Sequence, residues 1–199
     1  MRGRAAGGGA QGEAGGGGGG DRALGRGRGA ARPRLDRVIV GDAERLEPDS
    51  LQGPFDCVVC GDVLEHLRDP AGMLGRARGW LSPDGVLVAS LPNARHHSVV
   101  NALLGGNWTY EAAGLLDETH LQFFTRRDME DLFREAGFRV DRVGIVPGPG
   151  HDEWRSEGCP GEVRAGPLHI SEMPPEDAEE FFVYQYLWTA RAVSKDEAP

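Results

Sequence analysis

The segment CGDVLEHLRDP, residues 60 to 70, places two acids and one imidazole at spacings that could support chemistry. Asp62, Glu65 and His66 stand at positions i, i+3 and i+4, so on a helix they would share one face. Carboxylate oxygens and an imidazole nitrogen are suitable ligands for Mg²⁺, Mn²⁺ or Zn²⁺. Without a metal, the imidazole of His66 could act as a general base. A third interpretation, in which these residues only cap and pair around a helix start, stays open beside the other two.

Apolar runs on both sides of this segment predict the strands that position it. These runs are RVIV (37–40), FDCVVC (55–60) and GVLVASLP (85–92), and their continuity is typical of buried parallel strands. Between the second and third runs, residues 69–81 predict a helix, with Asp69 as its cap and Pro70 at its first position. Strand, helix and strand in that order make a right-handed βαβ unit. Residues 60–66 would then follow the carboxyl end of a buried strand.

The second half of the chain predicts two more helices and two late strands. Residues 92–108 indicate a helix closed by two glycines, and TRRDMEDLFREAGF (125–138) carries a capping-box pattern in Thr125 and Asp128. Residues 138–146 and 181–192 predict strands that form an antiparallel hairpin. The Gly- and Pro-rich stretch between them has about thirty residues, which predicts a long loop that serves as a substrate lid.

The cysteines do not indicate a metal or redox site. Cys57 and Cys60 have CxxC spacing, but residues three apart on a strand point to opposite faces of the sheet. We therefore interpret both as small core residues. Cys159, with His151 and His169 in the long loop, lacks regular ligand spacing and receives no role. An odd number of cysteines indicates a reducing compartment, so we expect a cytoplasmic protein.

Composition divides the chain into an ordinary domain and two tails. Residues 1–34 are rich in glycine and arginine, with seven arginines against two acids, and this composition predicts a disordered tail. Residues 35–193 form the predicted domain, and residues 194–199 are a short tail. The net charge is −9 and the Gly/Arg-rich tail carries +5, so the rest of the chain carries −14, and an acidic body does not attract nucleic acid. No apolar run approaches the length of a membrane span.

The order of these motifs resembles the class I S-adenosylmethionine-dependent methyltransferases, and within them the ubiquinone-biosynthesis-like O-methyltransferases. The similarity rests on four segments in the same order, which are VGDAERL, FDCVVCGDVLEHLRDP, LSPDGVLVASLPN and LLDETHLQFFTRRDMEDLFREAGF. They cover residues 37 to about 140. Each motif alone is weak, but four in order with suitable spacing predict the fold of this family.

The resemblance implies a cofactor site and a substrate site. In the family, the acid of the GDA motif, here Asp42, binds the adenine amino group, and Ala43 supplies a backbone contact beside it. The residues after the next strand, Cys60, Gly61 and Asp62, would flank the methionine part of S-adenosylmethionine. Ligands of open α/β sheets do bind at the carboxyl ends of strands. Three residues would line the substrate pocket of such a fold, namely His96, His97 and Trp108.

The resemblance also implies a partner for the acid and imidazole cluster. Some relatives hold a divalent metal with an acid-x-x-Glu-His motif, and RNA-directed relatives add a histidine that here corresponds to His120. Asp62, Glu65, His66 and His120 would then bind Mg²⁺, Mn²⁺ or Zn²⁺, which would lower the pKa of a substrate hydroxyl. Without a metal, His66 or His120 would be the catalytic base.

Two features of the family have no counterpart in this sequence. One is the Gly-rich loop after the first strand, and the other is the acid after the second strand. We therefore expect an α/β, Rossmann-like sheet, mostly parallel with an antiparallel terminal hairpin, that lacks the first βαβ segment. Cofactor binding by this chain should be impaired, and the bare sheet edge should favour association, for example as a homodimer.

The predicted function is methyl transfer from S-adenosylmethionine to an oxygen or nitrogen of a small molecule. One alternative is a non-catalytic module with the same fold, which the missing cofactor loop favours. Another is an RNA-directed methyltransferase, which the Arg-Gly tail and the shared acid and histidine motif suggest. The acidic domain argues against nucleic acid as a partner, and nothing in the sequence indicates a membrane partner.

Overall fold

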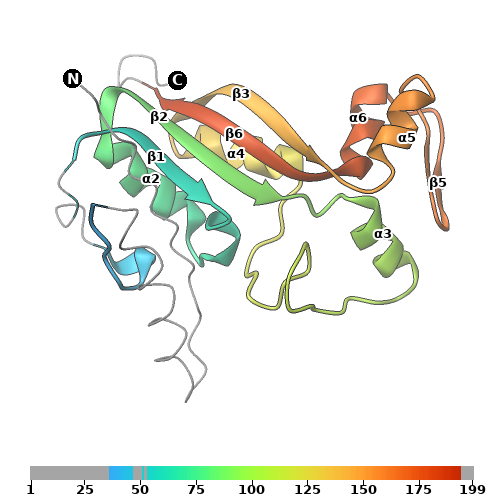
Figure 1. Cartoon of the computed structure of the whole chain (residues 1–199), viewed down its shortest axis with the longest axis horizontal. Helices are drawn as coiled ribbons and strands as arrows, with labels where there is room; N and C mark the ends of the chain where they lie inside the picture. Colours follow the sequence, from blue (N-terminus) through green and yellow to red (C-terminus); the bar gives the residue numbers. More distant parts are fainter. Residues whose placement is uncertain (1–35, 47–50, 52, 194–199) are drawn as a thin grey trace.

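The computed structural model describes residues 36–46, 51 and 53–193, and the two predicted tails lie outside the described residues. A four-stranded sheet with the order β1-β2-β6-β3 forms the body of the molecule (Figure 1). Its strands are β1 (Phe55–Gly61), β2 (Leu81–Pro92), β3 (Phe138–Pro147) and β6 (Val183–Ala192). All of the predicted strands from residue 55 onward are therefore present.

Strand direction in this sheet agrees with the predicted α/β fold. β1 is parallel to β2, with Cys60 opposite Ala89. β6 lies between β2 and β3 and is antiparallel to both, with Trp188 opposite Ala89 on one side and Val143 on the other. The three earlier strands thus share one direction, and the last strand of the hairpin enters the middle of the sheet in the opposite one.

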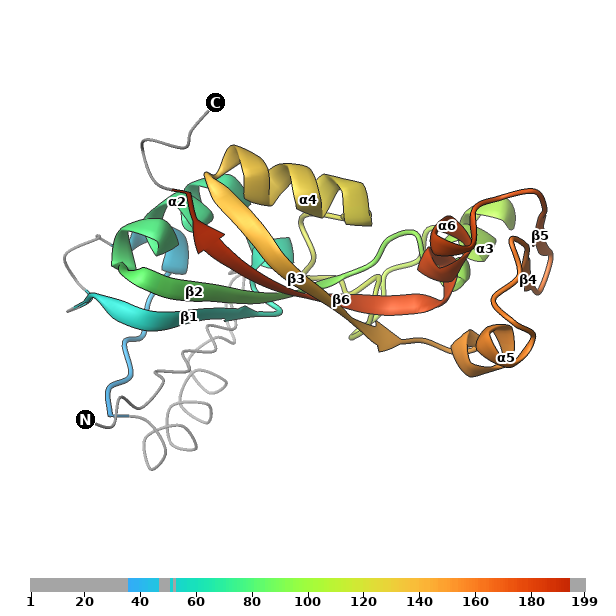
Figure 2. The same cartoon turned by 90° about the horizontal axis from the view of Figure 1, so that it is seen from above.

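Two helices, α2 (Pro70–Trp80) and α4 (Arg126–Glu135), cover one face of the sheet (Figure 2). Asp69 caps α2 by accepting from the Gly72 N–H, and Pro70 occupies the first turn, as predicted. The apolar stripe of α2 is buried against the sheet together with Met129 and Phe133 of α4. This layer forms the main hydrophobic core. No helix among the described residues is long and apolar enough to cross a bilayer.

The opposite face of the sheet and the outer edge of β1 are less well covered. Val59 of β1 and Leu187 of β6 point away from the core and are exposed. In the described part of the chain, β1 pairs with β2 alone. The predicted bare sheet edge corresponds to the outer edge of β1 in this part of the chain.

The prediction of a strand at residues 37–40 is wrong. This segment is extended but pairs with no described strand, and Ile39 and Val40 are exposed. Since strands require neighbours for their hydrogen bonds, a β-branched run without a partner strand forms no strand. It leads instead into a short 3₁₀ turn, η1 (Ala43–Arg45), which packs beside α2.

The prediction of a long loop before β6 is also wrong, because this region is a small folded lobe at one end of the molecule (Figure 2). It contains α5 (His151–Ser156), the hairpin β4 (Val163–Ala165) and β5 (Leu168–Ile170), α6 (Pro175–Glu179) and η4 (Glu180–Phe182). Trp154 and Phe182 stack within its own hydrophobic cluster. The predicted helix α3 (His97–Leu104) contacts this lobe, and Asn101 donates to the Ala165 carbonyl. The lobe is therefore structured rather than an open lid.

Helix α4 provides a test of the capping box. Thr125 and Asp128 satisfy each other's backbone N–H groups at its start. We expect Thr125→Ala to lower the free energy of unfolding by about 1 kcal/mol, measured by urea denaturation. Thr109→Ala, at an exposed residue outside helices and strands, is the matched control and should change little. Equal losses in the two variants would contradict a stabilising role of the cap.

Candidate functional site

The turn that follows β1 holds Asp62 in a different orientation from the predicted helical one. Asp62 has φ 51°, in the left-handed region, and its N–H donates to Ser90 Oγ at 2.9 Å. Its Oδ1 accepts from Ser90 Oγ at 2.8 Å and from the Gln185 side-chain amide. The helical turn η3 begins later and covers Leu64–His66. Asp62 therefore bonds to β2 and β6 and does not share a helical face with Glu65 and His66.

Glu65 is a buried carboxyl group at the carboxyl edge of the sheet. It is 1% exposed, and its Oε2 has no hydrogen-bond partner. Burial raises its pKa to about 7, and the nearby carboxylates of Asp62 and Asp117 also raise it. An unpartnered carboxyl in such a place is costly for the fold, which favours a functional interpretation over a purely structural one.

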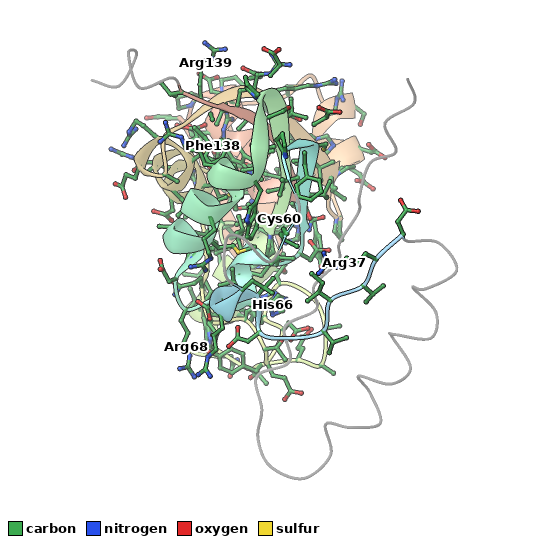
Figure 3. The ribbon with its side chains drawn as sticks, turned by 90° about the vertical axis from the view of Figure 1, so that its left-hand side faces the viewer. Arg37, Cys60, His66, Arg68, Phe138 and Arg139 are labelled. Carbon is green, nitrogen blue, oxygen red and sulfur yellow. The ribbon has the colours of Figure 1, made fainter. Side chains whose placement is uncertain are left out.

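Two imidazoles converge on Glu65. One side-chain ligand atom from each of Glu65, His66 and His120 lies within 4.8 Å of the other two, and the two rings meet edge-on with centroids 4.8 Å apart. Figure 3 shows His66 below the buried Cys60, which is near the end of β1. The structure thus brings together three of the four residues predicted as metal ligands and leaves Asp62 outside the group.

Hydrogen bonds to backbone carbonyls indicate the tautomer of both neutral rings. His66 Nδ1 lies 3.1 Å from the Thr119 carbonyl oxygen, and His120 Nδ1 lies 3.2 Å from that of Leu115. Because a carbonyl only accepts, each neutral ring carries its proton on Nδ1. Both Nε2 atoms therefore keep a free lone pair, which is what a metal ligand or a base requires. Burial also lowers the pKa of His120, which favours its neutral form.

The predicted cofactor residues lie at the turn η1 and at or just after the end of β1. The side chain of Asp42 caps η1 through the Glu44 N–H and forms an ion pair with Arg45. Asp42 is exposed, while Ala43 packs partly against the core. Gly61 is exposed, and a Cβ there would make only an ordinary contact with Ser90. Cys60 is buried, which raises the pKa of its thiol to about 11, so it can offer a cofactor its backbone rather than a thiolate.

The three predicted substrate residues lie in three different environments. His96 is 2% exposed and caps α3 through the Ser98 N–H. Its burial lowers its pKa to about 4, and His97 adds to this shift, so it is a neutral interior residue. His97 lines a cleft of about 660 Å³ between α3, α5 and β4. Trp108 is exposed and touches Phe123, whose ring also faces His120 at 6.1 Å.

Sequence reasoning missed four residues that support this site, which are Ser90, Asp117, Thr119 and Gln185. Asp117 could have been found, because an aspartate in a loop often accepts from the backbone N–H two residues on, here that of Thr119. Nothing local distinguishes Ser90 or Gln185. They reach Asp62 only because β2 and β6 are neighbours in the sheet.

Comparisons with known proteins agree with this arrangement. Residues 17–143 match the family described as "Methyltransferase domain", which covers more than half of the chain. A ubiquinone biosynthesis O-methyltransferase from Cereibacter sphaeroides is 33% identical over 101 residues, which are 50% of this chain and 41% of that protein. The enzyme of the same name from Roseobacter denitrificans is 34% identical over 119 residues, 58% of this chain and 46% of that protein. The chain thus spans less than half the length of these curated relatives.

A solved structure supports the fold. An S-adenosylmethionine-dependent methyltransferase from Clostridium acetobutylicum superposes with a TM-score of 0.52 at 10% sequence identity, covering 87% of this chain and 72% of that protein. The sheet, the family match and this superposition agree, and the chain belongs to the methyltransferase domain family, with the Rossmann-like fold of the class I S-adenosylmethionine-dependent methyltransferases.

Proposed function

We propose that this chain takes part in methyl transfer from S-adenosylmethionine to an oxygen or nitrogen of a small molecule and supplies the groups that activate the acceptor. The observation that carries the proposal is the buried Glu65 carboxyl beside two imidazoles whose Nδ1 atoms face backbone carbonyls. The relatives named above are O-methyltransferases of ubiquinone biosynthesis, which favours a hydroxyl oxygen as the acceptor atom.

The three side chains are suited to removing a proton from such a hydroxyl. The Nε2 atom of His66 or His120 would accept the hydroxyl proton as the acceptor oxygen forms its bond to the methyl carbon. When bound, S-adenosylmethionine would supply the electrophilic methyl group, and the broken carbon–sulfur bond would leave the thioether S-adenosylhomocysteine. Ionised Glu65 would stabilise the imidazolium that forms, and the apolar residues around it limit access of water. Trp108 and Phe123 extend from His120 toward solvent and would contact an apolar part of the acceptor.

The same three side chains also form a donor set for a divalent metal. One carboxylate and two imidazole nitrogens suit Zn²⁺ or Mn²⁺, and the bonds from both Nδ1 atoms to carbonyls are typical of metal-binding histidines. Glu65, His66 and His120 would hold such an ion, because one ligand atom of each lies within 4.8 Å of the other two. A bound ion would supply Lewis-acid activation of the acceptor hydroxyl.

The described residues fit one side of the cofactor. Asp42 is an exposed acceptor suited to an adenine amino group, and the exposed backbone at Gly61 suits the methionine part. No glycine-rich turn between a strand and a helix precedes β1 within the described residues. This observation favours a second candidate function, a non-catalytic module of the same fold.

Calorimetry with S-adenosylhomocysteine separates the two candidates. For methyl transfer we expect heat of binding at ligand concentrations up to about 1 mM, the weak end of useful affinity, and weaker binding after Asp42→Ala. Asp36→Ala, at an exposed acid ahead of η1, is the control and should bind as the wild type does. No heat at any concentration up to that limit would favour the non-catalytic module.

The metal is tested separately by thermal unfolding with and without Zn²⁺ or Mn²⁺. A metal that binds only the folded state raises the free energy of unfolding, by about 2.7 kcal/mol when its concentration is a hundred times Kd. Tm rises with it. We expect the increase to disappear in His120→Asn and to persist in His169→Asn, at an exposed histidine of the lobe. An unchanged Tm in the wild type would leave His66 and His120 as metal-free bases.

A further inference from the structure

The loop after α3 contains a hydrogen-bonded chain that ends on His66. Asp117 Oδ1 accepts from the Thr119 N–H at 2.8 Å and from Thr119 Oγ1 at 2.6 Å. Thr119 Oγ1 in turn lies 3.0 Å from His66 Nδ1. The bond from Thr119 Oγ1 to Asp117 is the short one, as expected for a hydroxyl that donates to a carboxylate.

The direction of each bond in this chain follows from counting protons. A hydroxyl has one proton, and Asp117, as a carboxylate, can only accept it. Thr119 Oγ1 therefore presents lone pairs to His66, and so does the Thr119 carbonyl oxygen at 3.1 Å. His66 Nδ1 thus faces two acceptors, and a proton on Nδ1 satisfies both of them.

We propose that Asp117 and Thr119 are positioning residues that hold neutral His66 in the tautomer with its proton on Nδ1. The Nε2 lone pair of His66 is then free to act in the cluster with Glu65 and His120. Asp117 acts by fixing the direction of the hydroxyl, because without it the Thr119 hydroxyl could turn and donate to Nδ1. The catalytic value of this hydrogen-bonded chain rests on the proposed function, but the tautomer of His66 can be measured without any methyl transfer.

His120 provides an internal control within the same protein. Its Nδ1 lies 3.2 Å from the Leu115 backbone carbonyl oxygen, and no hydrogen bond among the described residues joins its ring to the side chain of Asp117 or Thr119. Substitutions of these two side chains should change the tautomer of His66 and leave that of His120 as it was. A general loosening of the loop would instead change the tautomer ratio of both rings.

The test is ¹⁵N NMR of the full 199-residue chain with labelled histidine. The spectra are recorded with a chelator at about pH 8.5, roughly two units above the ordinary imidazole pKa. Nitrogen shifts distinguish protonated from unprotonated ring positions, and signals are assigned by His66→Asn and His120→Asn. In the wild type we expect both rings to carry their proton on Nδ1.

Three variants and a control measure the contribution of the side chains. Thr119→Val removes one of two acceptors, so the His66 tautomer ratio should move about fivefold toward Nε2–H, the value of one hydrogen bond. Asp117→Ala should move it at least as far, because the freed hydroxyl can now donate to Nδ1. Thr119→Ser keeps the hydroxyl and should restore the wild-type ratio. Thr109→Val is the control and should have no effect.

Two results would overturn the proposal. One is a wild-type His66 that carries its proton on Nε2, and the other is an unchanged ratio in both Thr119→Val and Asp117→Ala. If Asp117→Ala does not fold, the comparison of valine with serine at position 119 decides alone. Failure of S-adenosylhomocysteine to bind would count against the proposed function and leave this measurement intact, so the two failures are distinguishable.

Discussion

Trp188→Ala is expected to lower the free energy of unfolding by about 3–5 kcal/mol, enough to unfold much of a marginally stable domain. Trp188 lies on β6, the strand between β2 and β3, and is 0% exposed. Its ring stacks on Phe133 of α4 with centroids 5.4 Å apart. The substitution therefore leaves a cavity where the sheet meets its covering helix, at a place that backbone hydrogen bonds on both sides prevent from collapsing.

Urea denaturation followed by circular dichroism measures this loss. Trp108→Ala is the matched control, because Trp108 is 39% exposed and makes an edge-on contact with Phe123. It should cost less than about 1 kcal/mol. Trp188→Phe keeps most of the side-chain volume and removes an indole N–H that has no hydrogen-bond partner. Its loss of unfolding free energy should therefore lie between those of Trp108→Ala and Trp188→Ala. Similar losses at positions 108 and 188 would contradict the placement of the core.

Glu65→Gln is the second large effect, and its size depends on pH. The pKa of Glu65 is about 7 in the folded protein against an ordinary 4.5, because burial disfavours its charged form. Between these values the folded protein holds a proton that the unfolded chain has released, so the free energy of unfolding falls as pH rises. The stability that comes from the raised pKa of Glu65 is fully present below pH 4.5 and is lost as pH rises through 7. The full loss is at most about 3.4 kcal/mol, at about 1.36 kcal/mol for each pH unit between 4.5 and 7.

The glutamine side chain cannot ionise, so the variant should not show this loss. We expect the two proteins to have similar stability near pH 5 and the variant to be more stable by about 2–3 kcal/mol near pH 8.5. Urea titrations with a chelator, across this range, give both curves. Glu118→Gln, at an exposed acid in the same loop, should follow the wild type. Parallel curves for wild type and Glu65→Gln would show that Glu65 is ionised at neutral pH.

The helices could be predicted from the sequence because their signals are local. The Asp69 cap and Pro70 mark the start of α2, and Thr125 with Asp128 marks the start of α4. The order of the strands depends instead on contacts between residues far apart in the chain. Nothing near Trp188 indicates that β6 enters between β2 and β3 rather than at the edge.

The failed predictions have the same physical origin. The run at residues 37–40 has strand composition, but a strand forms only beside a neighbour that can accept its hydrogen bonds. The lobe after β3 was missed because its helices and strands are short, and periodicity needs longer windows than these to be visible. Its cluster around Trp154 forms only once the segments meet.

The candidate site was predictable in residue types but not in geometry. The motif identified Glu65, His66 and His120, and the loop before α4 brings them together. Asp62 stood in the same motif, yet its positive φ and its bonds to Ser90 and Gln185 turn it away from them. Spacing along a sequence assumes a regular helix, and a single left-handed residue removes that assumption.

The position of β6 in the sheet also has a consequence for synthesis on the ribosome. Among the strands that the structure describes, β3 pairs with β6 alone, and β6 is the partner of β2 on that side. A nascent chain therefore cannot complete this sheet until residues 183–192 have left the exit tunnel, although domains generally fold as units during synthesis. A premature stop before residue 183 would thus release a polypeptide in which β3 has no partner strand, rather than a smaller folded protein.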